Sequence, residues 1–350
     1  MEDIQHIFEF TIEKELSKHK FNQKELEKAI ENFENSLPSL IPKFANVLKK
    51  SLAKKTPNML RERRSDFDKF KKRLYKRWKK PIDMLEEYLV ISYETGEQFN
   101  NELGSGKSNR TNPKYKVLTS LHARACQVGF EVLELLKSGF SDGAHARWRT
   151  LHEVSVVTCF IADNEKGIAE KYLNHEYVES ARAANQYKKY YRSLGFKPIQ
   201  KEELKNFEEK KQLLLKRYGK DFLYDYGWAS KILDNSKPKF TDIEKFVGLN
   251  FLRPYYRMAG HNVHANAKGA NFRLGLSSSN ANILLAGASD EGLADPGQCT
   301  GLSLLYATSA LLSFKTNIDR LVITQVMYDY QSQLAKAFVE VSNKMKSTDA

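Results

Sequence analysis

The stretch from Asp142 to Ile161, DGAHARWRTLHEVSVVTCFI, decides how this chain folds. Its second half, from Val154 onward, is apolar on nearly every side of an α-helix, which indicates a central helix surrounded by others. Its first half carries charged residues, and charged residues that enter a buried helix need partners. Arg149 and Glu153 are four residues apart, so they can pair along the helix.

Helical spacing of apolar residues continues on both sides of this stretch. The preceding helix is expected from Lys114 to about Lys137, with an end near Gly139, and Asp142 is expected to cap the next one. Pro38 and Pro42 are expected to break the helical pattern. Further helices are expected over residues 3–36 (two helices, with Asn22 and Glu25 as a cap), 43–55, 58–80, 81–100, 165–194, 200–218, a short segment capped by Thr241, and 300–344 as one final helix.

No run of alternating strands is visible, and only residues 282–286 could form a short strand. The sequence therefore predicts an all-α fold: a helical bundle with a basic helical N-terminal region and a long C-terminal helix. The segment Gly104–Asn109 is similar to a phosphate-binding loop, but it lacks the P-loop spacing and follows a helix. A flexible linker is the better interpretation, and the expected division is 1–103, a linker at 104–113, and a bundle domain at 114–345.

The net charge of +13 is concentrated in one segment. Between Lys43 and Lys80 the chain has 16 Lys and Arg against 3 acidic residues, an excess equal to the net charge of the whole chain. This pattern indicates a polyanionic partner for that segment, although a solvated helix face is the alternative. Phe67, Phe70 and Trp78 have helical spacing, which favours packing over base stacking. The candidate nucleic-acid contacts are Arg61, Arg63, Arg64, Lys71, Lys72, Arg73, Lys76 and Arg77.

The three cysteines are far apart and show no CxxC spacing, which is typical of reduced thiols in a cytoplasmic protein. The N-terminus lacks the basic and apolar regions of a signal peptide. No apolar run approaches the roughly 18 to 20 residues that cross a bilayer. The expectation is a cytoplasmic protein with no membrane association.

A second stretch, Tyr255–Asn266 (YYRMAGHNVHAN), holds two of the eight histidines. Arg257 and His264 are seven residues apart, almost two helical turns, so they project from the same side of a helix. Their Cα atoms would lie about 10 Å apart along the axis. A long arginine could share a cleft with His264 if another element closes that cleft.

Three interpretations of His261 and His264 remain open. The two rings could be satisfied by hydrogen bonds near a helix end. They could bind a metal, but zinc needs further ligands and no HExxH motif is present, so no metal and no cofactor is predicted. Alternatively, Arg257 and His264 could cleave a phosphodiester, because an imidazole can act as general acid or base and a guanidinium can neutralise a phosphorane.

The charged residues of the first stretch also have two interpretations. Arg149 and Glu153 could be a structural pair that orders the core, or they could line the same cleft as His264. Arg147 and His152 form an alternative Arg–His pair, but five residues separate them by about 140° around a helix. They cannot both face one point without distortion.

These two stretches together resemble the bacterial domain-of-unknown-function family numbered 5677. Asp142 and Arg149-Thr-Leu-His-Glu153, followed far downstream by Tyr256-Arg257-Met-Ala-Gly-His-Asn-Val-His264, are similar to its Arg-x3-Glu and Tyr-Arg…Ser…Val-His helices. The resemblance covers about residues 115–325. The chain departs at Gly260, near where the family often has serine.

The spacing Arg257-x6-His264 is also similar to the Arg-x4–6-His motif of HEPN ribonucleases, and Arg147-x4-His152 fits the same loose pattern. That resemblance implies an all-α, homodimeric ribonuclease of toxin–antitoxin, abortive-infection or CRISPR systems, with RNA and another defence-system protein as partners. We therefore expect a metal-independent endoribonuclease, an anti-phage or toxin effector. His264 and Arg257 would be catalytic, and Arg149 and Glu153 would orient the site. The alternatives are a non-enzymatic nucleic-acid- or partner-binding protein, and a metal or nucleotide enzyme of another class.

Overall fold

The computed structural model describes residues 22–276 and 284–348. Within these ranges the chain forms helices and no strand, which confirms the all-α prediction. The expected helix before residue 22 lies outside the described residues, as do residues 282–283 of the possible strand at 282–286; its other three residues, 284–286, have no regular structure. The chain divides into two compact units, one ending at Phe70 and the other starting at Lys71.

A single long helix, α2 (Gln23–Leu103), runs through most of the basic N-terminal region. It begins with the expected cap, in which the Asn22 side chain accepts from the Glu25 N–H and the Glu25 carboxylate accepts from the Asn22 N–H, each at 3.0 Å. The prediction that Pro38 and Pro42 break the helix is wrong, because α2 continues through both. A proline removes one bond of the helical ladder, and on an exposed helix water can satisfy the free carbonyl.

Within the second unit, α2 kinks at Trp78, whose dihedral angles (φ −100°, ψ 15°) are not helical. The kink lies three residues before Pro81, whose ring displaces the carbonyl of residue 77. The Trp78 indole is buried, donates from Nε1 to the Asp290 carbonyl at 2.8 Å and lies 6.1 Å from the Phe338 ring. The predicted packing of Trp78 is therefore confirmed, and together with buried Leu74 it anchors this part of α2 in the core.

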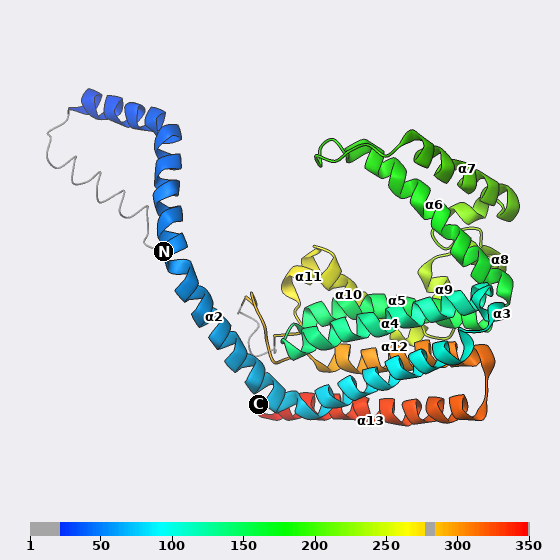
Figure 1. The fold of residues 1–350 in the computed structure, drawn as a ribbon. Helices are drawn as coiled ribbons and strands as arrows, with labels where there is room; N and C mark the ends of the chain where they lie inside the picture. The colour runs from blue at the N-terminus through cyan, green and yellow to red at the C-terminus, as the bar shows by residue number, and fades with distance from the viewer. Residues whose placement is uncertain (1–21, 277–283, 349–350) are drawn as a thin grey trace. The chain divides into compact units, whose positions relative to one another are not determined.

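The bundle consists of α4 (Pro113–Lys137), α5 (Ser141–Asp163), α12 (Ala294–Leu312) and α13 (Ile318–Thr348), packed beside the second part of α2 (Figure 1). The predicted central position of α5 is confirmed, since α5 packs against α4, α12, α10 (Arg253–Val263) and α9 (Phe240–Phe246). The predicted bounds of α4 are also confirmed. It ends at Gly139 (φ 76°), where the Phe140 N–H donates back to the Leu135 carbonyl in a Schellman turn.

Two expectations in this bundle are wrong. Asp142 does not cap α5; its carboxylate instead accepts from the backbone N–H of Leu274 at 2.9 Å and of Gly275 at 3.5 Å, which ties a distant loop to the start of α5. The expected final helix over 300–344 is two helices, α12 and α13, which pack against each other. The Asn317 side chain separates them, because it accepts from the Arg320 N–H at 2.9 Å and caps α13.

The remaining elements connect and cover this bundle. The segment predicted to be a linker holds one helical turn, α3 (Lys107–Arg110). Helices α6 and α7 form a hairpin that projects from the bundle (Figure 1). No helix in the described ranges has the length and apolar character needed to traverse a bilayer. The other elements are α6 (Lys166–Tyr190), α7 (Lys201–Tyr218), α8 (Ser230–Leu233), α11 (Ala267–Asn271) and the short 3₁₀ helices η1 (Lys220–Leu223), η2 (Gly227–Ala229), η3 (Asn250–Leu252) and η5 (Ser313–Lys315).

Candidate functional site

A buried polar network joins α5, α9 and α10. Glu244 on α9 is fully buried and accepts from His152 Nε2 at 2.8 Å through one carboxylate oxygen. Its other oxygen accepts from the Arg253 guanidinium at the start of α10. A buried carboxylate is tolerated only when charge and hydrogen bonds compensate it, and here both oxygens have cationic or polar partners. The network fixes the three helices relative to one another.

The His152 ring is neutral in this network. Burial lowers its pKa to about 4, and the positive charge of Arg253 acts in the same direction. Nε2 therefore carries the single ring hydrogen that is donated to Glu244. Nδ1 is buried and has no hydrogen-bond partner, so a second proton would find no acceptor. His152 serves the fold as a hydrogen-bond donor.

A second, half-buried cluster joins α5 and α10 beside this network. One Glu153 oxygen accepts from both the Tyr256 hydroxyl and Arg149 Nε, the latter at 3.3 Å. The Arg149 guanidinium lies over the Tyr256 ring at 4.4 Å. Burial raises the pKa of Tyr256, and the hydrogen bond to Glu153 raises it further. The predicted Arg149–Glu153 pair is thus present, and Tyr256 links it to α10.

Gly260 brings α10 close to this cluster. A Cβ atom at position 260 would lie 3.2 Å from a terminal nitrogen of Arg149. The Arg149 side chain therefore reaches across to the helix face that bears Arg257 and His261. Burial lowers the pKa of Arg253, and the neighbouring positive charges of Arg257 and Arg149 lower it further. Three guanidinium groups are consequently gathered at this end of the α5–α10 contact.

The outer face of α10 carries Arg257 and His261 one turn apart, with His264 at its end. Arg257 and His264 are exposed, and among the described residues neither side chain has a hydrogen-bond partner. The structure differs from the expected single helix in one respect: α10 ends at Val263, and His264 is its C-cap with extended dihedral angles (φ −108°, ψ 140°). The His264 N–H still donates to the Gly260 carbonyl at 3.1 Å, so the residue stays at the helix end.

The ring of His261, unlike that of His264, has an orienting partner. The Asn266 side-chain oxygen accepts from the Gly269 N–H at 2.7 Å and caps α11. The Asn266 amide nitrogen then faces His261 Nδ1 at 3.1 Å. The Asn266 side-chain oxygen is 3.3 Å from the same Nδ1. Nδ1 can therefore accept from the amide nitrogen or, when it carries a hydrogen, donate to the oxygen. Asn266 orients the His261 ring in either case.

The alternative Arg147–His152 pair is not brought together. Arg147 binds Glu131 on α4, whereas His152 binds Glu244 on α9. The two side chains leave α5 in different directions, as their spacing of five residues requires. His152 is also sealed from solvent.

The basic side chains of α2 lie on its exposed face. In the first unit Arg61, Arg63 and Arg64 are exposed. In the second unit the predicted contacts are exposed except Lys71, which is half-buried: Lys72, Arg73, Lys76 and Arg77. Arg77 is paired with Asp290, so its charge is partly compensated.

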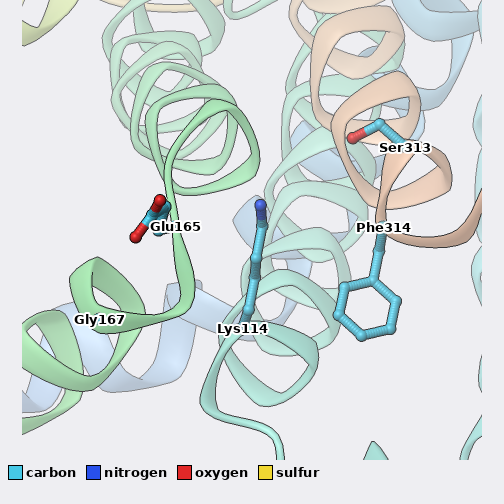
Figure 2. Close-up of a pocket in the computed structure, with 5 residues that line it drawn as sticks. All are labelled: Lys114, Glu165, Gly167, Ser313 and Phe314. Carbon is cyan, nitrogen blue, oxygen red and sulfur yellow. The ribbon is translucent and has the colours of Figure 1, made fainter.

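Two pockets lie elsewhere in the bundle. The first, of about 480 Å³, is lined by Lys114, Glu165, Gly167, Ser313 and Phe314 (Figure 2). Lys114 donates to the carbonyls of Ala162 and Asn164, at 2.5 and 2.8 Å, and so caps the end of α5. Its charge therefore serves the fold.

The second pocket, of about 530 Å³, lies over buried His122. His122 Nε2 is 3.1 Å from the Thr308 hydroxyl, which is 2.9 Å from the Ser92 hydroxyl. This polar group is internally satisfied. In the described part of the chain, no three His, Cys, Asp or Glu side chains are grouped so that they could hold a metal ion.

Sequence reasoning missed three members of the site: Glu244, Arg253 and Tyr256. The signals for them were weak. Glu244 lies in a short helix whose residue spacing does not reveal its burial. The spacing within α10 does not show that Arg253 and Tyr256 lie on its buried side and Arg257 on its open side. Their roles depend on which elements pack against α10, and that follows from the tertiary structure.

These features define a class: an all-α bundle protein whose central helix is bridged by polar groups to a helix with an open arginine- and histidine-bearing face. Residues 115–282 match the model of DUF5677, a family of unknown function. The matched region contains both stretches that carry the resemblance, so the match supports it. Searches of curated proteins and of solved structures returned no significant match.

Proposed function

We propose that this protein is a HEPN-like, metal-independent endoribonuclease that uses Arg257 and His264, acting as an anti-phage defence or toxin effector. One observation carries the proposal: both side chains, one on α10 and one at its end, are exposed and have no hydrogen-bond partner in the described ranges, while buried Glu244 and half-buried Arg253 fix the helix that presents them. A side chain that binds substrate must be accessible, and its backbone must be held firmly.

The chemistry needs only these groups and the RNA. His264 takes the proton of a ribose 2′-hydroxyl, and that oxygen forms a bond to the adjacent phosphorus. The bond from phosphorus to the 5′-oxygen breaks, and the leaving oxygen receives a proton from the protonated form of His261, which becomes neutral. The products are a 2′,3′-cyclic phosphate and a 5′-hydroxyl. Arg257 neutralises the charge that builds on the phosphorane oxygens.

Arg149 and Glu153 are positioning residues in this scheme. Glu153 binds Arg149 Nε, and the Tyr256 ring supports the guanidinium from one face. This arrangement directs Arg149 toward Gly260 and adds positive charge beside Arg257. A homodimer would supply a second Arg257–His264 pair, as the HEPN resemblance implies.

The test is cleavage of a defined single-stranded RNA in the presence of EDTA. His264→Ala is expected to lower the rate about 10²- to 10⁴-fold, which is typical for loss of a general acid or base. Arg257→Ala is expected to lower it similarly. The matched control is Arg124→Ala, which removes an exposed arginine from α4. Full activity of His264→Ala would remove this residue from the mechanism.

The exposed basic face of α2 favours a second candidate function, a nucleic-acid-binding protein without catalysis. In that case charge reversal of Lys71, Lys72, Arg73, Lys76 and Arg77 would abolish binding and His264→Ala would not alter it. No RNA would be cleaved by the unmodified protein. Binding affinity should fall steeply with salt in this case, because released counterions drive it.

A further inference from the structure

The turn between α6 and α7 concentrates positive charge. Between Glu179 and Glu202, over residues 180–201, the chain has six Lys and Arg and no acidic residue. Arg182 is paired with Asp225, at the base of this segment. The other five cations lie at the tip of the hairpin (Figure 1) and are exposed: Lys188, Lys189, Arg192, Lys197 and Lys201.

The same tip carries stacked aromatic rings. The Tyr187 ring is stacked with those of Tyr191 and Phe196, with centroid distances of 6.3 and 6.4 Å and interplanar angles of 19° and 7°. Gly195 (φ 70°) makes the turn, and the Phe196 N–H donates back to the Tyr191 carbonyl at 2.9 Å. The Tyr187 hydroxyl donates to the Lys197 carbonyl, also at 2.9 Å. The stack is therefore built into the turn.

Phe196 of this stack and its neighbours Tyr190 and Leu194 are open to solvent, whereas Tyr187 and Tyr191 are half-buried. Tyr190 is 55% exposed, Leu194 58% and Phe196 59%. A stacked aromatic set on a projecting turn contributes little to a core, yet it presents flat apolar faces between lysines. Nucleic-acid bases stack on such faces irrespective of sequence, and flanking cations contact the phosphates.

We propose that the α6–α7 tip, Tyr187 to Lys201, binds a single strand of nucleic acid, with Tyr190 and Phe196 as stacking faces and Lys188, Lys189 and Lys197 on phosphates. That the strand is RNA rests on the proposed function. An acidic protein partner would satisfy the lysines but would leave the aromatic faces without flat partners. A duplex would hide its bases from them. Charge and ring geometry together therefore favour an unpaired strand.

The experiment measures fluorescence anisotropy of labelled U12 RNA and dT12 DNA with the full chain carrying His264→Ala, which prevents cleavage. Tyr190→Ala combined with Phe196→Ser is expected to weaken U12 binding at least tenfold, because each lost stacked base typically costs that order. Tyr190→Ala alone, which leaves the turn and its stack intact, should weaken binding about fivefold. Lys188→Gln, Lys189→Gln and Lys197→Gln together should reduce the log–log salt slope by about 2, at roughly 0.7 per phosphate contact.

The matched controls are Leu213→Ser and Lys216→Gln, which remove exposed apolar and basic side chains from α7. Both should bind within twofold of the parent protein. Tighter binding of U12 than of dT12 supports RNA, and equal affinity supports a single strand without sugar discrimination. Tighter binding of dT12 overturns the assignment to RNA, and tighter binding of a 12-base-pair duplex overturns the inference as a whole.

Tip variants that bind U12 as tightly as the parent protein also overturn the inference. If such variants differ from the parent only in molar mass, measured by light scattering, the tip is assigned to protein association instead. The inference and the proposed function fail separately. Tip-dependent binding by a wild-type chain that cleaves no RNA removes the nuclease alone. Cleavage that depends on His264 with binding that ignores the tip removes this inference alone.

Discussion

The two sides of α10 use the same residue types for different purposes. On the buried side, Arg253 is held by Glu244, which also binds His152. On the open side, Arg257 and His264 are exposed and make no hydrogen bond with a described residue. An arginine lies on each side of α10, and His152 of α5 joins the network on the buried side, but only Arg257 and His264 are open to a ligand.

This difference teaches how a degenerate motif should be interpreted. An Arg–His spacing identifies two side chains, but burial and partners decide whether they are available. In the alternative Arg147–His152 pair, His152 would have to leave buried Glu244 to act, and breaking such an interaction costs several kcal/mol. The open pair needs no rearrangement. The comparison therefore assigns structure to one pair and proposes chemistry for the other.

The largest expected effect separates the two sides by activity. Arg257→Ala and His264→Ala should reduce RNA cleavage by about 10²- to 10⁴-fold while changing stability by less than about 0.5 kcal/mol, because both side chains are exposed. Single-turnover cleavage and urea unfolding of the same preparations give both numbers. If Arg257→Ala and His264→Ala lost unfolding free energy as well as activity, the assignment of these two side chains to an open side without a structural role would be contradicted.

The next effect falls on the buried side. Glu244→Ala should cost about 3–5 kcal/mol of unfolding free energy, since it leaves Arg253 and His152 without their acceptor. Urea denaturation measures the loss. The control is Glu209→Ala, which breaks the exposed Lys205–Glu209 pair of 3.6 Å and should cost less than about 0.5 kcal/mol. A loss below about 1 kcal/mol for Glu244→Ala would mean that the network does not hold the helices.

Acid sensitivity is the third expected effect. Burial lowers the pKa of His122, His145 and His152 to about 4. The unfolded chain, with a histidine pKa near 6.5, binds these protons first, so stability is full above about pH 6.5 and falls as the pH drops toward 4. Each histidine accounts for about 2 kcal/mol between pH 7.5 and pH 5.

His145 tests this most directly, because both its ring nitrogens are buried without hydrogen-bond partners. His145→Phe should remove about 2 kcal/mol of the stability change between pH 7.5 and pH 5, measured by urea midpoints at each pH. Tyr190→Ala, which removes an exposed side chain, should keep the full change. An unaltered pH slope in His145→Phe would show that this ring is already charged or solvated in the folded state.

The smallest effect is expected at Gly260, where α10 lies close to Arg149. Gly260→Ser restores the residue type that the resembled family often has nearby, and its Cβ would sit 3.2 Å from an Arg149 nitrogen. A flexible guanidinium can shift by a few tenths of an ångström, and serine gains helix propensity over glycine, so stability should change by less than about 1 kcal/mol. Cleavage should change by less than tenfold.

Gly297→Ser on α12 is the contrast to this substitution. Its Cβ would lie 2.3 Å from the buried Phe338 ring, and such overpacking should cost about 1–3 kcal/mol. Equal losses at positions 260 and 297, measured by thermal or urea unfolding, would mean that Arg149 is held as rigidly as a core side chain.

Local signals were sufficient for several elements. The apolar run after Val154 predicted a central helix, and Gly139 predicted the end of α4 through its left-handed backbone. These local signals failed where a residue had a partner far away in the sequence, or where a helix continued through a proline. Asp142 binds a loop more than 130 residues away, and α2 continues through Pro38 and Pro42. Asn317 was overlooked as a cap, so α12 and α13 were joined.

The site was predictable only in part for the same reason. The Arg149–Glu153 pair follows from helical spacing and is present. Glu244 and Tyr256 are members of the site because α9 and α10 pack on α5, which no spacing within one helix encodes. His264 was placed on the helix, but α10 ends one residue earlier.

The sequence by itself determined that the chain is helical, where its charge lies and which stretches carry arginine and histidine together, because these depend on neighbours a few residues apart. The tertiary structure decided which of those groups are sealed and which are open. Burial, desolvation and hydrogen-bond partners arise only when distant helices meet, and here they distinguish His152 from His264.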